Sequence, residues 1–154
     1  MTEKKPLRIP DSHIDLLTSN YSATMTTVRH NDGLLTTNPV TAHWIDNTVK
    51  ISTLKSRMKY KNIVADNRVT VCVVSPTDRM HYIEIRGRAS LEDDLDRRFH
   101  DSMFEKTVGS PPPEDMDPAG AQRVVITVHP EQISHPTLYG GRFGGKKNSL
   151  IIKP

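Results

Sequence analysis

The sequence predicts a mainly β fold with α-helices, in which six antiparallel strands close into a barrel. Apolar and polar residues alternate with a period of two over several short segments, as in half-buried strands. Tight-turn signals at Asn31-Asp32-Gly33 and Asp46-Asn47 join neighbouring segments, so those strands run antiparallel. The helical patterns are few and fall between strands. Closing such a sheet into a barrel removes its unpaired edges.

The first half of the chain contains four predicted elements. Asp11 or Ser12 is a candidate cap for a short N-terminal helix, since a short polar side chain can accept a hydrogen bond from a free amide of the first turn. Pro39 cannot donate to a neighbouring strand, which limits its segment to a sheet edge or a bulge. The four elements are a helix over 10–20 and strands over 21–30, 35–45 and 48–54.

The second half begins with a helix for which Thr53 and Ser56 are the candidate N-caps. In the clearest alternating strand Ile83, Ile85, Gly87 and Ala89 face one side. The last helix carries its apolar face on Leu95, Phe99, Met103 and Phe104. The elements are a helix with Tyr60, Ile63 and Val64 on its apolar face, strands over 68–75 and 81–90, a helix over 92–108, a loop over 110–118 and a strand over 123–129.

Length and composition predict one domain with a thin core. The chain has 154 residues, and 35% of them are hydrophobic, a low fraction that a second subunit or a bound cofactor could compensate. Residues 1–135 form the predicted cofactor-binding domain, and residues 136–154 a flexible tail rich in glycine and lysine. The net charge of +3 is too small to indicate nucleic acid as a partner.

Few features of the sequence indicate disulfides, membrane association or metal binding. Cys72 is the single cysteine, so no intrachain disulfide forms, and its apolar neighbours suggest a buried structural thiol. The polar N-terminus and the lack of a long apolar segment predict a cytoplasmic protein with no membrane partner. The seven histidines show no ligand spacing, so no metal site is predicted.

The residues with the strongest functional signal lie between 51 and 63. Lys55, Arg57, Lys59 and Lys61 gather at the start of a predicted helix, where the helix dipole disfavours cations by about 0.3–1 kcal/mol each. Free amides, hydroxyls and basic side chains at such a position form a phosphate site. The alternative is that these long side chains are simply solvated.

Three ordered motifs resemble a known family. They are Ser52-Thr53 followed by Arg57-x-Lys59, Lys61-Asn62 and Ala65–Val69, then the upstream Asn38–Val40 and the downstream Tyr82–Ala89. Together they resemble the split-barrel flavin-binding family, which includes pyridoxamine-phosphate oxidases and reductases that use the deazaflavin coenzyme F420. The likeness covers about residues 10–135, and the upstream and downstream motifs match the deazaflavin branch.

This resemblance implies a six-stranded split β-barrel that forms a homodimer, with the cofactor at the subunit interface. It also implies an oxidoreductase that transfers hydride from F420 to an unsaturated small molecule. Lys55 and Lys61 are candidates for contact with the acidic oligoglutamate tail of the coenzyme, or for solvation. The implied cofactor-binding residues are Arg57 and Lys59 for the phosphate, Ser52 and Thr53 for hydroxyl bonds, Asn62 nearby, and Asn38, Pro39 and Val40 along the ring.

Other functions remain as alternatives. The nearest is an FMN-dependent reductase or oxidase of the same fold, followed by a flavin or F420 carrier without turnover. A basic barrel that binds nucleic acid ranks last, since aromatic residues are only 5% of the chain. Pyridoxamine-phosphate oxidases carry a C-terminal tryptophan segment, and here no tryptophan follows Trp44, so that activity is not expected. The resemblance assigns no catalytic side chain.

Overall fold

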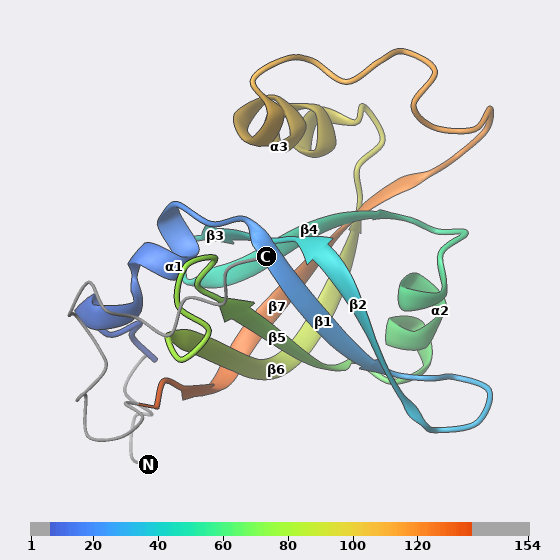
Figure 1. The fold of residues 1–154 in the computed structure, drawn as a ribbon. Coiled ribbons are helices and arrows are strands. Elements are labelled where there is room, and N and C mark those ends of the chain that lie inside the picture. The colour runs from blue at the N-terminus through green and yellow to red at the C-terminus, as the bar shows by residue number, and fades with distance from the viewer. Residues whose placement is uncertain (1–6, 137–154) are drawn as a thin grey trace.

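A computed structural model describes residues 7–136 of the chain (Figure 1). All seven strands belong to one antiparallel sheet, in the order β2-β1-β5-β6-β7-β4-β3. The elements in chain order are η1 (Asp11–His13), α1 (Asp15–Thr18), β1 (Ser22–Val28), β2 (Leu35–Thr41), β3 (His43–Ile45), β4 (Thr48–Leu54), α2 (Met58–Ala65), β5 (Arg68–Val74), β6 (Tyr82–Asp93), α3 (Arg98–Val108) and β7 (Arg123–Ser134).

The sheet curls into a split barrel, as the sequence predicts, but with seven strands in place of six. The predicted strand over 35–45 breaks at Ala42, whose amide donates to the Tyr21 carbonyl at 2.8 Å. Before the break β2 pairs with β1, and after it β3 pairs with β4. These are the two ends of the strand order, so the chain crosses here from one edge of the sheet to the other. Pro39 lies on the edge strand β2, as predicted.

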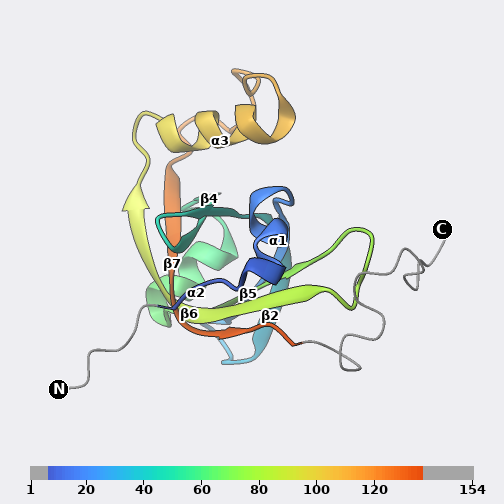
Figure 2. The same cartoon turned by 90° about the vertical axis from the view of Figure 1, so that its left-hand side faces the viewer.

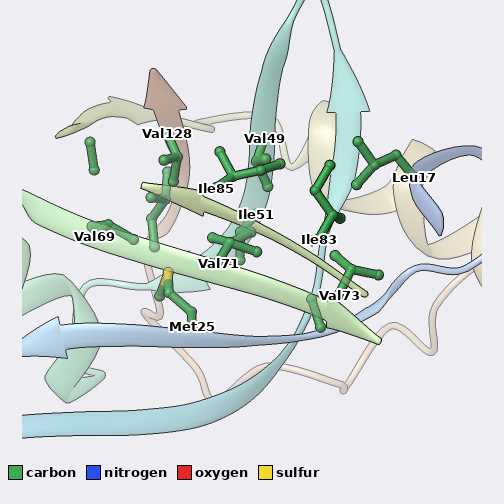
Figure 3. Close-up of a cluster of buried hydrophobic side chains, with 14 of the residues drawn as sticks. Leu17, Met25, Val49, Ile51, Val69, Val71, Val73, Ile83, Ile85 and Val128 are labelled. Carbon is green, nitrogen blue, oxygen red and sulfur yellow. The ribbon is translucent and has the colours of Figure 1, made fainter. Parts of the chain in front are cut away.

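The core lies inside the curled sheet, where aliphatic side chains from most of the strands meet (Figure 3). Ile83, Ile85, Val71 and Val128 are fully buried. Along β6 buried and half-buried or exposed residues alternate from Tyr82 to Ser90, which confirms the predicted inward face. Burial of each such side chain contributes about 1.5–3 kcal/mol to folding.

Gly87 marks the closest approach of β6 and β7. The pairing of these strands shifts register between Arg86 and Gly87. A Cβ atom at position 87 would lie 1.9 Å from the His129 carbonyl oxygen, which no real side chain could tolerate. The glycine therefore permits the bulge that bends these two long strands around the barrel.

The helix starts differ from the predictions. The N-terminal segment forms a 3-10 turn and a one-turn helix, and neither Asp11 nor Ser12 provides a side-chain cap. Helix α2 starts after Arg57, again without a side-chain cap, so the predicted caps Thr53 and Ser56 are wrong. On α2 Ile63 is buried, whereas Val64 is exposed.

Helix α3 starts at Arg98 and not at residue 92, because β6 continues to Asp93. The Asp94 carboxylate accepts hydrogen bonds from the amides of Phe99 and His100, at 3.1 and 2.9 Å. A carboxylate satisfies free amides at this end of a helix and suits its dipole, so Asp94 caps α3. Within residues 7–136 no helix is long and apolar enough to cross a membrane.

Helix α3 and residues 109–122 form an arm at one end of the barrel. In Figures 1 and 2 the arm stands apart from the sheet and is connected to it through the ends of β6 and β7. Its helix is amphipathic, with Phe99, Met103 and Phe104 only half-buried. The space between this arm and the barrel holds the candidate site.

Candidate functional site

A cleft with two compartments lies between the arm, strand β4 and the start of α2. The cationic compartment has a volume of about 620 Å³, and Thr53, Arg57 and Asp117 are among the residues found only in its wall. The apolar compartment has a volume of about 340 Å³ and includes Val40 and Phe104. Ser52, Lys59, Met116 and Arg123 line both compartments, so the two are continuous.

The cationic compartment brings together the four predicted phosphate residues. Ser52 and Thr53 come from β4, Arg57 is the residue before α2, and Lys59 lies in the first turn. Neither Arg57 nor Lys59 has a carboxylate within 4.0 Å in the described part of the chain. Burial, and then the charge of Arg57, lower the pKa of Lys59. A bound anion would compensate this half-buried ammonium.

The backbone adds two donors to this compartment. Arg57 has an extended conformation and provides no side-chain cap for α2. The amides of Tyr60 and Lys61 donate to the Arg57 carbonyl, at 3.1 and 3.4 Å, whereas those of Met58 and Lys59 have no backbone acceptor among the described residues. The open amides and the dipole of α2 favour an anion at this place.

The other two lysines of the basic cluster do not reach the cleft. Lys55 forms an ion pair with Asp93 at 2.8 Å, and its amide donates to the Gln122 carbonyl. Lys61 is exposed and lies outside both compartments. The structure therefore separates the cluster into a pair that faces the cleft, Arg57 and Lys59, and a pair that does not.

An ion pair that the sequence analysis missed attaches the arm to the barrel. Arg123, the first residue of β7, donates to both carboxylate oxygens of Asp117, at 2.7 and 2.5 Å. Its remaining nitrogen lies 3.3 Å from the Ser52 hydroxyl oxygen. The hydrogen bonds from Arg123 lower the pKa of Asp117. This pair holds the loop over the cleft, and no local pattern around Asp117 indicates it.

The apolar compartment is built from segments far apart in the chain. Pro39 and Val40 come from β2 and His43 from β3, while Met103 and Phe104 come from α3. Its wall is mostly apolar, so a flat conjugated ring would fit it. Pro39 and Val40 were predicted as ring contacts, whereas His43, His100, Met103, Phe104 and Met116 are among the members that no sequence pattern indicated.

Two predicted residues do not enter the cleft. Asn62 is 1% exposed, and its amide oxygen bonds to the backbone amide and ring Nδ1 of His30, at 3.0 and 2.9 Å. Its amide nitrogen donates to the Thr27 hydroxyl at 3.1 Å. Asn62 thus joins α2 to β1 and the hairpin. Asn38 is half-buried on β2 opposite Met25 and is not part of either compartment wall.

The metal and tail predictions can be compared with the structure only in part. Residues 7–136 contain no group of three or more histidine, cysteine, aspartate or glutamate side chains that could hold a metal ion. Cys72 is half-buried on β5, and burial raises the pKa of its thiol. The predicted flexible tail over 136–154 lies outside the described residues apart from Pro136.

A family model described as pyridoxamine 5'-phosphate oxidase matches residues 9–135. The structure is similar to that of an F420 reductase, with 28% sequence identity and a TM-score of 0.72, over 82% of this chain and 98% of the other. No match was found among curated proteins.

Two more distant structures share the fold. General stress protein 26 from Bacillus anthracis is 19% identical, with a TM-score of 0.63, over 81% of this chain and 91% of the other. An FAD-binding protein from Mesorhizobium loti is also 19% identical, with a TM-score of 0.57, over 82% and 92% of the two chains.

Proposed function

Because the chain belongs to the pyridoxamine 5'-phosphate oxidase family, we propose that it is an oxidoreductase that uses the deazaflavin coenzyme F420 to reduce an unsaturated small molecule. One observation carries the proposal: Arg57 and Lys59 face the cationic compartment without a carboxylate partner in residues 7–136. An anion bound between them would stabilise a half-buried ammonium beside a guanidinium. The likeness to an F420 reductase supports the choice of coenzyme.

The residues of the cleft have separate roles in this proposal. The planar fork of Arg57 binds two phosphate oxygens, Lys59 adds a point charge, and the Ser52 and Thr53 hydroxyls donate further bonds. When bound, the coenzyme supplies a hydride from its ring, and the protein supplies orientation. The apolar compartment, with Val40 and the arm as its walls, holds the ring against the substrate and excludes water.

Equilibrium binding of F420 and of FMN to the purified apo-protein tests the choice of cofactor. We expect F420 to bind more tightly, because it carries more total negative charge than FMN and Arg57 and Lys59 make the cleft cationic. The affinity should fall as salt rises, since exposed charges are screened over about 8–10 Å at physiological ionic strength. Equal affinity for both cofactors without salt dependence would favour the FMN-dependent alternative.

Three variants test the phosphate assignment. Arg57→Ala should weaken F420 binding by about ten- to a hundredfold, the usual range for one charged hydrogen bond. Lys61→Ala is the matched control, because Lys61 lies in α2, four residues after Arg57, and has the same charge but lies outside the cleft. If the double variant of Arg57 and Lys59 to Ala binds F420 like the wild type, the phosphate assignment is wrong.

Turnover tests the enzymatic part of the proposal. Reduced F420 should be oxidised by the wild type when a quinone or a conjugated enone is added, and the rate should fall in Arg57→Ala. Binding without turnover over a panel of quinones, enones and tetrapyrroles would support a carrier in place of an enzyme.

We also propose that the protein is a homodimer. Apolar side chains at the tip of the β1–β2 hairpin and on α2 are exposed, including Leu34, Leu35 and Val64. A second copy that covered them would remove this apolar surface from water. Sedimentation at micromolar concentration should show a dimer, and a monomer would contradict this proposal.

A further inference from the structure

His43 is a buried histidine in the wall of the apolar compartment, and the roles proposed above do not use it. It is the first residue of β3, directly after the break at Ala42, and is 3% exposed. Its ring packs on that of Tyr21, with the centroids 4.7 Å apart and the planes tilted by 35°. The same residue lines the apolar compartment.

The two nitrogens of His43 have no hydrogen-bond partner among the described residues. Nδ1 is completely buried and unpaired. Burial, and then the charge of Lys106, lower the pKa of His43, so the ring is neutral at neutral pH and carries one N–H. A buried N–H without a partner is destabilising, so the proton is expected on Nε2 and not on the buried Nδ1.

His100, the other histidine of this compartment, differs in this respect. Its Nδ1 lies 2.8 Å from an Asp101 carboxylate oxygen, within hydrogen-bonding distance. The carboxylate can only accept from a neutral imidazole, so the proton of a neutral His100 lies on Nδ1 and its Nε2 is an acceptor. With both rings neutral, His43 is therefore the histidine of this compartment whose N–H no residue in 7–136 accepts.

We propose that Nε2–H of His43 donates a hydrogen bond to a carbonyl oxygen of a flat conjugated ring in the apolar compartment. A proton on Nε2 leaves Nδ1 as an unpaired acceptor, which avoids a buried N–H without a partner. Val40, Met103 and Phe104 make the surroundings apolar, which strengthens such a bond. The ring belongs to the coenzyme or to the substrate. Only this identity rests on the function proposed above.

Binding of two matched probes to the apo-protein tests the hydrogen bond. The probes are 2,3-dimethyl-1,4-naphthoquinone, whose blocked ring carbons cannot add the Cys72 thiol, and 2,3-dimethylnaphthalene, which lacks the carbonyls. The measured quantity is the ratio of their dissociation constants in each variant, so differences in probe solubility cancel. Trp44, the neighbour of His43 and the single tryptophan of the chain, provides the fluorescence signal.

His43→Phe keeps the aromatic contact with Tyr21 and removes the donor. We expect this variant to lower the preference for the quinone by about 3- to 10-fold. His43→Gln should retain most of the preference, because its amide can donate from a similar place. His129→Phe is the matched control on the exposed face of β7 and should behave like the wild type. An unchanged preference in a folded His43→Phe variant would overturn the proposal, and the melting curve establishes folding.

The same titrations on protein loaded with F420 identify which ring is bound. A quinone that binds to the loaded protein with the same dependence on His43 indicates a substrate carbonyl. A quinone that F420 displaces, with a bound-coenzyme absorption band that shifts in His43→Phe, indicates a carbonyl of the coenzyme. Loss of the dependence on His43 in both experiments would overturn the inference. If F420 does not bind but the apo-protein keeps the dependence, the proposed function fails and the inference stands.

Discussion

The two compartments of the cleft are assembled in different ways. The cationic compartment takes most of its functional groups from one short segment, Ser52 to Lys59, in which a strand passes into a helix. The apolar compartment combines β2, β3, β4 and α3, which are far apart in the chain. The first compartment therefore depends on local geometry and charge, and the second on the position of the arm. Variants that affect one compartment and not the other measure this difference.

The largest effect is expected from breaking the Asp117–Arg123 ion pair, because Arg123 lines both compartments. Arg123→Ala would remove both hydrogen bonds to the Asp117 carboxylate and leave it only the longer ion pair with Arg97, at 3.9 Å. The side chains of Arg123 and Asp117 are only 10% and 9% exposed. We expect a loss of about 3 kcal/mol in the free energy of unfolding, at the low end for a broken buried pair because the cleft lies beside it. Urea denaturation measures this loss.

Arg123→Ala should also weaken ligand binding in both compartments, because Arg123 lines both and holds the loop through Asp117. Arg88→Ala is the control, since Arg88 pairs with Glu131 at an exposed position with both side chains more than half accessible. Exposed pairs contribute little. If Arg123→Ala binds both a phosphate-bearing ligand and the naphthoquinone like the wild type, the two compartments do not share a wall.

The next effect should fall on the apolar compartment alone. Phe104→Ala removes a half-buried ring from the inner face of α3, and half of a full aromatic burial corresponds to about 1 kcal/mol. The dissociation constant of the naphthoquinone should rise about fivefold. Inorganic phosphate, which needs only the cationic compartment, should bind as before. A parallel loss of phosphate binding would show that α3 also supports the cationic compartment.

This difference in assembly also explains which parts the sequence could predict. Strand alternation and turn chemistry are local, so most elements could be predicted, as could the proximity of Ser52, Thr53, Arg57 and Lys59 in one wall. Asn62 lies in the same segment, yet its side chain turns toward His30 and Thr27, which are 32 and 35 residues away. Contacts of this kind, like the Asp117–Arg123 pair, depend on tertiary packing, which no local sequence pattern indicates.

The position of the arm also depends on tertiary packing that the sequence pattern does not predict. The amphipathic pattern of Met103 and Phe104 predicted a helix with one apolar face, but not that this face lines a cleft in place of packing on the sheet. The predicted helix over 92–108 begins six residues before α3, because the acidic residues around Asp94 fit the first turn of a helix. The Asp94 carboxylate accepts hydrogen bonds from amides in the first turn of α3, although Asp94 itself precedes the helix.

A smaller effect of opposite sign is expected at Lys59. In the apo-protein this ammonium is half-buried beside Arg57 at the positive end of α2, which disfavours it. Lys59→Met should therefore stabilise the apo-protein by about 0.3–1 kcal/mol while it weakens phosphate binding. Thermal melting with and without phosphate measures both changes. A variant that is less stable without ligand would mean that Lys59 is not strained in the free protein.

The smallest expected effect is a loss of folding stability in acid. One group from each compartment, His43 and Asp117, loses its contribution over a different pH range. The pKa of His43 lies below its ordinary value of 6.5, so the unfolded chain takes up this proton first as pH falls. Its contribution to stability is present above pH 6.5 and is lost as pH falls from there to the folded pKa. The pKa of Asp117 lies below 3.8, so its contribution persists to about that pH and is lost only below it. His13 is also buried with a lowered pKa and adds to the first phase.

Urea midpoints between pH 7 and pH 3 should fall in two steps. His43→Leu should reduce the step near pH 6, Asp117→Asn should reduce the later one, and the exposed control His129→Leu should change neither. If His43→Leu leaves the first step intact and His13→Leu removes it, the acid response belongs to His13 and not to the cleft.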